Sequence, residues 1–358
     1  MILSWYLTKA YLTRFFALLF GLVVFLQMLD LLANADAVLE GGGDPVDALS
    51  RYIMLRVPSI IETVAPLAGL LGGLTALVVL ARNSEIIAMR AAGRSVLSLI
   101  GGLVVVGMFL AAVLFVFSDR VVVRFNATLE DWKSTGYKPG GEIIDGSEAW
   151  VIEGDTIIRV GDVLRNGAVL NDIRLFRQSD TSAVDDIINI RLAIWENGTW
   201  NLFEVERVGG DGSRGPVPTE GDVWNTQFTP EDFNKLANPP SELTFDELEH
   251  YVRELAVGTR PAYYYDTWLQ RKLAGPAVLA LMPLLAAVAA FAHHRQGSAV
   301  MVVVYGISLG FVFIVTDNLM LAMGQFGALP PVMAAWMPLA LFGTIGLWIV
   351  VNLENKGA

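Results

Sequence analysis

Residues 81–95 read ARNSEIIAMRAAGRS and separate two apolar runs, 63–81 and 96–118, that contain no charged residue. A hydrocarbon core of about 30 Å is crossed by roughly 20 apolar residues in a helix, so each run predicts a transmembrane helix. Four other runs meet the same criterion: 15–32 with Asp30, 273–292, 298–323 with Asp317, and 332–351. The sequence therefore predicts a polytopic α-helical membrane protein with six transmembrane helices, three before and three after a long polar block.

The stretch between the second and third runs carries the signals of a short helix of its own. Asn83 or Ser84 can cap its first turn, Glu85 suits the positive end of a helix dipole, and Gly93 supplies a stop. Glu85 and Met89 fall on one face of such a helix because they are four residues apart. A plain connector needs neither caps nor a patterned face. We therefore expect a helix at 83–93 that docks on a partner protein, with an inert connector as the alternative.

The polar block, residues 119–266, has the composition and pattern of a water-soluble domain. It holds 27 acidic and 14 basic residues, a net charge of −13, whereas the remaining 9 acidic and 11 basic residues give +2. Apolar and polar residues alternate from about 137 to 228, which predicts strands. Asn197-Gly198 predicts a tight hairpin turn, and Thr244 and Glu247 have the spacing of a helix capping box. We expect an all-β domain, a sandwich or jellyroll, flanked by helical connectors and inserted between residues 1–118 and 267–358.

Composition excludes several classes of protein. With 54% hydrophobic and 17% charged residues, the chain is too apolar for an ordinary soluble domain. Without cysteine it has neither disulfides nor thiolate metal sites. It contains no G-x-x-x-x-G-K-[ST] motif, so we expect no nucleotide hydrolysis by this chain. Loop residues on the basic side of the membrane explain His293 and His294 better than a metal site does. We expect no catalytic residues, no cofactor and no metal ion, and therefore no enzyme.

The short loops set the expected orientation, because cytoplasmic loops are rich in lysine and arginine. A cytoplasmic N-terminus places most of these bases inside, namely Lys9, Arg14, Arg82, Arg90, Arg94, Arg295 and Lys356. The C-terminus then also lies inside, and the loop at 31–56 and the acidic block lie outside. The first apolar run is longer than the core of a signal peptide, so we expect it to remain as a span despite Ala33-Asn34-Ala35. Four bases lie on the outer side against the rule: Arg51, Arg56, Arg271 and Lys272.

Three carboxylates lie within the predicted membrane helices or at their ends: Asp30, Glu62 and Asp317. Charge at membrane depth is costly and usually functional. Asp30 and Glu62 lie near the outer ends of their helices, where they could reach water, whereas Asp317 is deeper. For Asp317 we favour a carboxylate paired with a neighbouring side chain over a proton or ion relay.

Several of these stretches together resemble one family of membrane proteins. Residues 81–95, RVPSIIETVAPLAGLLGGL (56–74) and GISLGFVFIVTDNLMLAMGQFGALPP (306–331) are similar to segments of the LptF/LptG permeases. These permeases are the membrane subunits of the lipopolysaccharide export ABC transporter. The resemblance covers nearly the whole chain, including the order of three spans, a periplasmic β-jellyroll and three spans. LQMLDLL (26–32) is more similar to the LptG branch of the family than to LptF.

The resemblance implies a permease subunit in the bacterial inner membrane that extracts lipopolysaccharide and passes it to a periplasmic bridge. The partners it implies are an LptF-like permease in a heterodimer, an LptB-like ATPase dimer, and the LptC-like and LptA-like jellyroll proteins. Residues 83–93 correspond to a coupling helix, so contacts with the ATPase are expected at Ser84, Glu85, Met89 and Arg90. The phosphates of lipopolysaccharide are expected to bind bases at the outer ends of the spans: Arg51, Arg56, Arg120, Arg124, Arg271 and Lys272.

The chain departs from the family in its outer bases. LptG relatives can carry a lysine near the outer end of the first span, where this chain reads MLDLLANADAVLE (28–40), and Ser59 stands where another base can occur. Two other functions stay open. One is the permease of another lipid or lipoprotein ABC exporter, although such proteins commonly insert their soluble domain between the first two spans. The other is a proton-coupled secondary transporter that uses Asp317, although the sequence shows no convincing inverted repeat.

Overall fold

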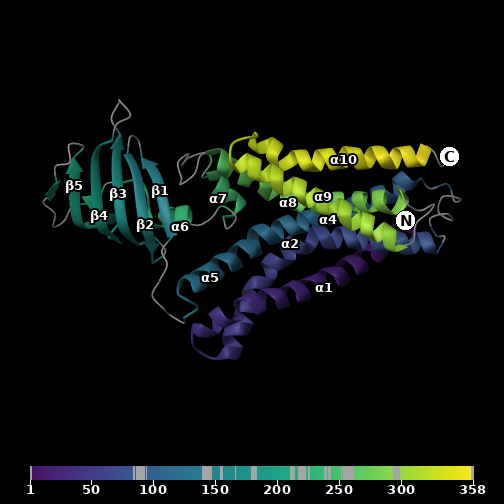
Figure 1. Cartoon of the computed structure of the whole chain (residues 1–358), viewed down its shortest axis with the longest axis horizontal. Helices are drawn as coiled ribbons and strands as arrows, with labels where there is room; N and C mark the ends of the chain where they lie inside the picture. Colours follow the sequence, from purple (N-terminus) through teal and green to yellow (C-terminus); the bar gives the residue numbers. More distant parts are fainter. Residues whose placement is uncertain are drawn as a thin grey trace. The chain divides into compact units, whose positions relative to one another are not determined.

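The protein is described from a computed structural model, which covers residues 2–83, 85, 93, 95–138, 147–153, 156–165, 167–178, 184–209, 214–216, 223–224, 226–237, 240, 243–250, 252, 262–292 and 299–355. These residues include six helices that are long and apolar enough to cross a membrane, and an antiparallel sheet inserted after the third (Figure 1). This architecture confirms the predicted fold class. The chain divides into two compact units: the helical unit, residues 1–35, 50–126 and 266–358, and the β unit, residues 36–49 and 127–265.

The long helices lie three on each side of the sheet in the sequence. They are α1 (Ile2–Glu40), α2 (Pro45–Arg82), α4 (Val96–Phe117), α8 (Ala262–Ala292), α9 (Ala299–Gln325) and α10 (Pro331–Asn355). Helix α4 continues through a π-helical turn, η1 (Ser118–Val122), into α5 (Val123–Ser134). In the helical unit, the first turn of α1 and the last turn of α10 lie at the same end (Figure 1). This is the arrangement that an even number of membrane crossings produces.

Residues 31–56, expected as a loop, are mostly helical. Helix α1 runs on to Glu40 and α2 starts at Pro45, so only residues 41–44 connect them. Asp30 interrupts the apolar run near its end, but a polar residue does not end a helix. The break comes at Gly42 and Gly43, whose φ values of 83° and 97° suit glycine. Asp44 then accepts a hydrogen bond from the backbone N–H of Val46 at 2.9 Å, which caps the start of α2.

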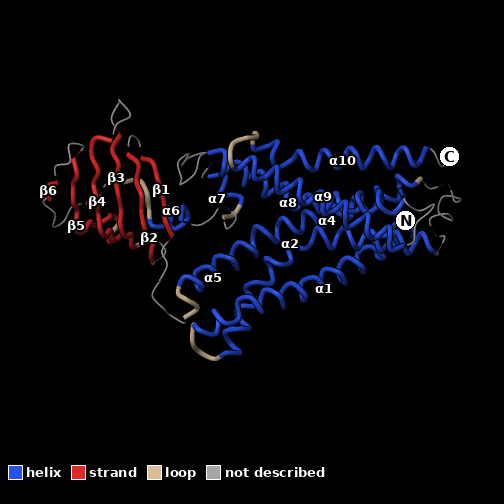
Figure 2. Tube along the Cα trace, in the orientation of Figure 1, coloured by secondary structure: helices blue, strands red, loops and turns tan. Residues whose placement is uncertain are grey.

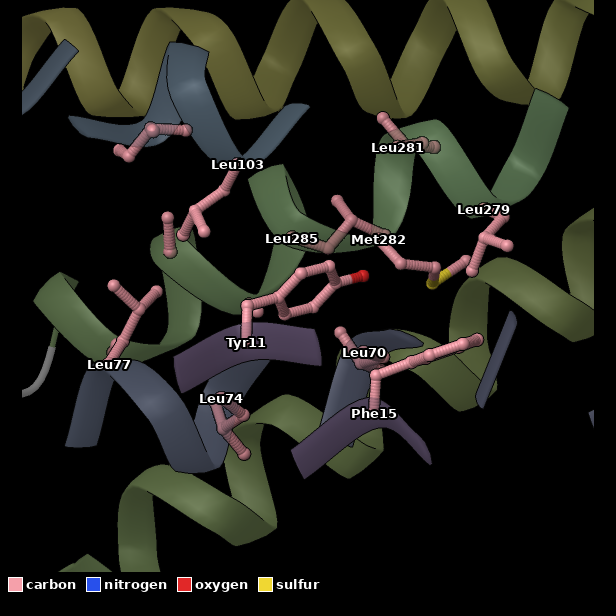
Figure 3. Packing of buried hydrophobic residues seen from close by; sticks show 14 of the residues in the cluster. Tyr11, Phe15, Leu70, Leu74, Leu77, Leu103, Leu279, Leu281, Met282 and Leu285 are labelled. Carbon is pink, nitrogen blue, oxygen red and sulfur yellow. The ribbon is translucent and has the colours of Figure 1, made fainter. Parts of the chain in front are cut away.

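Small residues of α2 let α1 approach closely in the core of the helical unit. Tyr11 and Phe15 of α1 are buried in the same cluster as Leu70 and Leu74 (Figure 3). A Cβ atom added to Gly72 would lie 3.0 Å from the Cα of Phe15. Membrane helices gain little from the hydrophobic effect between them, so close contact of this kind supplies much of their association.

Replacing Gly72 with leucine is therefore expected to separate α1 from α2. The added side chain meets the backbone of Phe15 rather than a flexible side chain, so the helices must shift. Overpacking of this kind costs about 1–3 kcal/mol. A lower unfolding temperature in detergent, compared with a Gly21→Leu control, checks this result. Gly21 is a suitable control because an added Cβ there meets nothing within 4 Å. Equal unfolding temperatures of the two variants would contradict the close packing of these helices.

The strands of the β unit pair in the order in which they occur in the sequence (Figure 2). They are β1 (Ser147–Glu153), β2 (Thr156–Leu164), β3 (Val169–Gln178), β4 (Val184–Glu196), β5 (Thr199–Gly209) and β6 (Arg214–Pro216), while β7 (Val223–Trp224) also pairs with β5. The predicted hairpin at Asn197-Gly198 is confirmed. Both residues have positive φ, 53° and 83°, and Trp195 faces Trp200 across the hairpin.

A cluster of aromatic side chains closes the apolar face of this sheet. Trp200 is fully buried and donates from its indole N–H to the carbonyl of Phe228 at 2.9 Å. Phe233, on α6 (Pro230–Ala237), packs edge-on against Trp200 with ring centroids 5.5 Å apart. The capping box predicted after the sheet is also confirmed. The N–H of Thr244 donates to the Glu247 carboxylate at 2.8 Å, ahead of α7 (Phe245–His250).

Side chains of a regular strand point alternately to the two faces of the sheet, and this alternation is broken along one line across the strands. Buried residues in β3 follow each other at an interval of three, Leu170 and Ile173, instead of two, and the same occurs in β2 and β4. We call this line the crease. It consists of the residues at which the pairing of successive strands is interrupted, Gly161, Asp172, Arg191 and Glu204. Asp172 and Glu204 have φ values of 48° and 54°, in the left-handed region that few residues other than glycine, asparagine and aspartate adopt. Charge pairs line the crease, including Arg191–Glu204 at 2.6 Å.

Candidate functional site

The six bases expected to bind phosphate all belong to the helical unit and lie toward one end of it. They are Arg51 and Arg56 on α2, Arg120 in η1, Arg124 on α5, and Arg271 and Lys272 on α8. Polar contacts near these residues join different helices. Ser118, after α4, bonds to Glu62 on α2, and Gln270 on α8 accepts from the indole N–H of Trp336 on α10. The six bases are thus distributed over several helices of one unit.

The guanidinium of Arg56 is paired with the carboxylate of Asp30 on α1. The Arg56 Nε and Nη2 atoms each lie 3.1 Å from Oδ1 of Asp30. The hydroxyl of Tyr52, one turn before Arg56, donates to Oδ2 of the same carboxylate at 2.7 Å. One acid on α1 thus holds two side chains of α2. The Arg56 side chain remains 36% exposed, so this contact leaves part of the guanidinium open.

Arg271 has a similar partner in the second half of the chain. Its Nη1 atom lies 2.6 Å from Oδ2 of Asp317, which is on α9. Asp317 is only 4% exposed. The prediction that Asp317 pairs with a neighbouring side chain is therefore confirmed. Because the partner is itself one of the six expected phosphate-binding bases, substrate binding at Arg271 stays a prediction.

The bases at the end of α4 stand on an irregular helix. The π-helical turn η1 places Asp119 and Arg120 just after Ser118, whose hydroxyl donates to Glu62 at 2.5 Å. Single π turns are rare and occur frequently at functional sites. The Arg120 side chain is 71% exposed. Its Nε atom lies 4.0 Å from Oδ2 of Asp119, a long distance that makes this a weak ion pair. Arg120 is thus the most open of the three bases for which an ion pair is described.

The other three expected phosphate-binding bases differ in exposure. Arg51 and Arg124 are exposed, and Lys272 is partly buried. Each of the three makes an interaction with other groups of the protein. Their roles in phosphate binding stay predictions.

The expected ATPase-coupling residues lie mostly outside the described part of the chain. This applies to Ser84, Met89 and Arg90, and also to His293 and His294. Glu85 is described. Its Oε1 atom accepts from the side-chain amide of Asn83 at 3.2 Å and lies 3.4 Å from the hydroxyl of Tyr6, at the start of α1. The coupling role of all four residues stays a prediction.

Comparison with known proteins gives the family. The family described as the lipopolysaccharide export system permease LptF/LptG matches residues 5–352. The chain belongs to this family. It is also similar to the lipopolysaccharide export system permease protein LptG of Escherichia coli (strain K12), with 24% identity over 358 residues and 98% of each chain covered. The LptG of Haemophilus influenzae is 24% identical over 352 residues, which cover 96% of this chain and 97% of the relative.

Membership in the LptF/LptG family confirms the resemblance noted in the sequence. The chain is a permease component of a lipopolysaccharide export system, a multi-pass membrane protein without a catalytic role. It is not assigned to the other classes that the sequence left open, the lipoprotein exporters and the proton-coupled transporters.

Sequence reasoning missed the partners of the two paired bases. Asp30 and Tyr52 are 22 residues apart, and Arg271 and Asp317 lie on different helices. An acid within a predicted membrane helix indicates that a partner group is present, but it does not indicate which residue that partner is. No pattern in the sequence predicted the π turn at Ser118–Val122.

Proposed function

We propose that this chain is the LptG-type permease subunit of an ABC transporter that extracts lipopolysaccharide from the inner membrane and passes it to a periplasmic bridge. The single observation that carries this proposal is the family match over residues 5–352. The near-complete coverage of two LptG relatives supports it. In this assembly the chain pairs with an LptF-like permease, an LptB-like ATPase dimer supplies the energy, and LptC-like and LptA-like proteins accept the lipid.

The division of labour follows from the cost of moving a lipid. Exposing acyl chains to water costs about 0.8 kcal/mol per CH₂ group, so the lipid must stay in apolar surroundings throughout. Apolar side chains remain open on the peripheral helices, including Phe20 on α1 and Phe311 on α9, which are 73% and 65% exposed. Such surfaces suit lipid or a second membrane subunit. The energy then has to come from a separate ATPase.

The proposal includes an orientation with both termini in the cytoplasm and the β unit in the periplasm. Arg82, at the end of α2, and the segment after it then face the ATPase, and the six outer bases face the periplasmic side of the membrane. Single cysteines test this orientation well because the chain has none of its own. Membrane-impermeant reagents are expected to label a Thr199→Cys variant in intact spheroplasts and a Glu354→Cys variant only after lysis.

Purification of the tagged chain from its own membranes tests the function. An ATPase subunit, a second permease and lipopolysaccharide are expected to copurify. Depletion of the chain is expected to leave newly made lipopolysaccharide in the inner membrane. If the purified complex instead held lipoprotein, and lipopolysaccharide still reached the outer membrane after depletion, the proposal would be wrong.

Photocrosslinking tests the substrate-binding bases. A photoreactive amino acid placed at Arg51, Arg56 or Arg120 is expected to form adducts with lipopolysaccharide, because a phosphate at the outer ends of the helices meets these positions. A contact with a charged group contributes about 1.5–3 kcal/mol, so alanine at one of them should weaken binding roughly tenfold or more. Phe20 provides a control on the exposed apolar face of α1. Adducts at Phe20 but at none of the three bases would remove those bases from the phosphate site.

A further inference from the structure

The carboxylate of Asp30 is fully engaged by α2. Its Oδ1 atom accepts from Arg56, and its Oδ2 atom accepts from Tyr52 at 2.7 Å. Arginine and carboxylate form one of the strong classes of hydrogen bond because both groups are charged. We call this contact the α1–α2 clasp: Asp30, Tyr52 and Arg56.

A second polar group with unmet hydrogen-bonding capacity lies beside the clasp. Gln27 is one turn before Asp30 on α1 and therefore on the same face of the helix. Its side chain is buried, with 8% exposed, yet neither atom of its amide has a hydrogen-bond partner among the described residues. A buried amide without a partner costs free energy. The amide can recover that cost by donating to an acceptor that is absent from the free protein.

The two charged side chains of the clasp are partly exposed. The Arg56 and Asp30 side chains are 36% and 19% exposed, so an anion can reach the guanidinium before the pair separates. While Asp30 holds Arg56, the pair is neutral and attracts an anion weakly. A phosphate group carries more negative charge than a carboxylate and offers more acceptor oxygens. It can therefore replace Asp30 at the fork of the guanidinium.

We propose that Asp30 competes with a phosphate group for Arg56, and that phosphate binding opens the clasp and releases the C-terminal half of α1 from α2. Gln27 donates to the phosphate in the open state. The proposal rests on the proposed function, because it concerns how the bases of that site meet a phosphate-bearing substrate. The phosphate can belong to a lipid headgroup or be free in solution.

The position of the clasp on α1 decides what its opening does. The N-terminal half of α1 is fixed by buried Tyr11 and Phe15, packed against glycines of α2. Only 11% of the most apolar segment of α1 is buried, against 61% for α2. The clasp is a polar contact between α2 and the second half of α1. Opening it leaves that half attached through its N-terminal packing and through residues 41–44, which connect it to α2.

Distances between spin labels test the clasp in the full-length chain in nanodiscs. Met28→Cys and Met54→Cys place labels on α1 and α2, at side chains that are 73% and 68% exposed. Nanodiscs of phosphatidylcholine are compared with nanodiscs that also contain phosphatidic acid, and with phosphatidylcholine nanodiscs in inorganic phosphate. We expect one narrow distance distribution in phosphatidylcholine and a longer, broader one with phosphatidic acid. A response to phosphatidic acid alone assigns the site to a lipid headgroup, and a response to both assigns it to any accessible phosphate.

The variant Asp30→Asn separates the clasp from a merely structural contact. Asparagine keeps the size and can still accept from Tyr52, but it removes the charge that competes for Arg56. We expect the broad distribution without any added phosphate, and phosphatidic acid binding that is tighter by about tenfold. In Arg56→Gln the response to phosphatidic acid should be lost. Asp36→Asn, the same change six residues later on α1, should behave as the parent chain.

An Asp30→Asn chain with an unchanged distance distribution and unchanged affinity for phosphatidic acid would overturn the proposal. This result is separate from a failure of the proposed function. If the clasp responds to phosphatidic acid but lipopolysaccharide neither binds nor copurifies, the proposed function fails. If lipopolysaccharide copurifies but the distances never change, only the clasp fails.

Discussion

Replacing Glu85 with lysine is expected to reduce lipopolysaccharide export at least tenfold while the chain still inserts in the membrane. Glu85 is the described acid of the expected coupling helix at 83–93, and its carboxylate is oriented by Asn83 at 3.2 Å. If an ATPase groove binds this carboxylate, lysine removes a charged hydrogen bond, worth about 1.5–3 kcal/mol, and adds repulsion. A difference of 1.4 kcal/mol corresponds to about tenfold. Copurification of the ATPase and arrival of labelled lipopolysaccharide at the outer membrane measure the two effects.

Two control variants define what the Glu85 result means. Glu85 lies near Tyr6, at the start of α1, whereas Glu40 is the last residue of that helix. Glu40→Lys reverses an exposed charge there and is expected to change neither measurement. Tyr6→Phe removes a long contact of 3.4 Å to Glu85 and is expected to have only a small effect. Normal ATPase copurification together with normal export in Glu85→Lys would exclude a coupling role for this residue.

Replacing Asp317 with alanine is expected to have the second large effect, on the stability of the helical unit. The carboxylate is 4% exposed and pairs with Arg271 at 2.6 Å. Removing one partner of a buried ion pair leaves an uncompensated charge and costs about 3–5 kcal/mol. We expect little correctly assembled protein and a strongly reduced unfolding temperature in detergent. The double variant Arg271→Leu/Asp317→Leu should recover most of the loss, because it removes both charges and fills the space with apolar atoms.

Asp317→Asn distinguishes this structural role from a proton relay. Asparagine keeps the size of the side chain and a carbonyl oxygen beside Arg271, so it is expected to cost less stability than alanine, and export by the assembled complex is expected to stay close to normal. A relay needs a group that takes up and releases a proton, which asparagine cannot do. Loss of export in Asp317→Asn, with normal assembly and normal ATP hydrolysis, would falsify the pairing role and restore the relay.

The sequence predicted the six helices and the sheet because each has a strong local signal. The apolar runs are long and uncharged, and the turn at Asn197-Gly198 needs positive φ that both residues tolerate. The ends of α1 and α2 were predicted less well, since hydropathy records where a helix leaves the apolar region and not where it stops. The crease was also missed. Period-two alternation describes a regular strand, and nothing in the residues around Asp172 announces the change of phase.

The site was predicted as a set of residue types but not as a set of contacts. The outer bases stood out as exceptions to the orientation rule, and the resemblance to the LptF/LptG permeases implied a phosphate-bearing ligand for them. Which acid meets which base depends on the packing of helices that are distant in the sequence, as Asp30 with Arg56 and Asp317 with Arg271 show. The pattern in both pairs is that a more buried helix, α2 or α8, supplies the arginine and a more exposed neighbour, α1 or α9, supplies the acid. Periodicity within one helix cannot reveal this relation.

The crease limits how the β unit can change in length during evolution. Each strand from β2 to β5 contributes one residue to that line, so the strands stay in register although the alternation shifts. Deleting Asp172 alone would return β3 to an interval of two, while β2 and β4 keep an interval of three at the same level, so the pairing would slip by one residue beyond that point. A compensating deletion in β3 alone cannot restore the pairing with both neighbours. Lineages are therefore expected to gain and lose residues in the connections between these strands, and to inherit Gly161, Asp172, Arg191 and Glu204 as a block of fixed spacing.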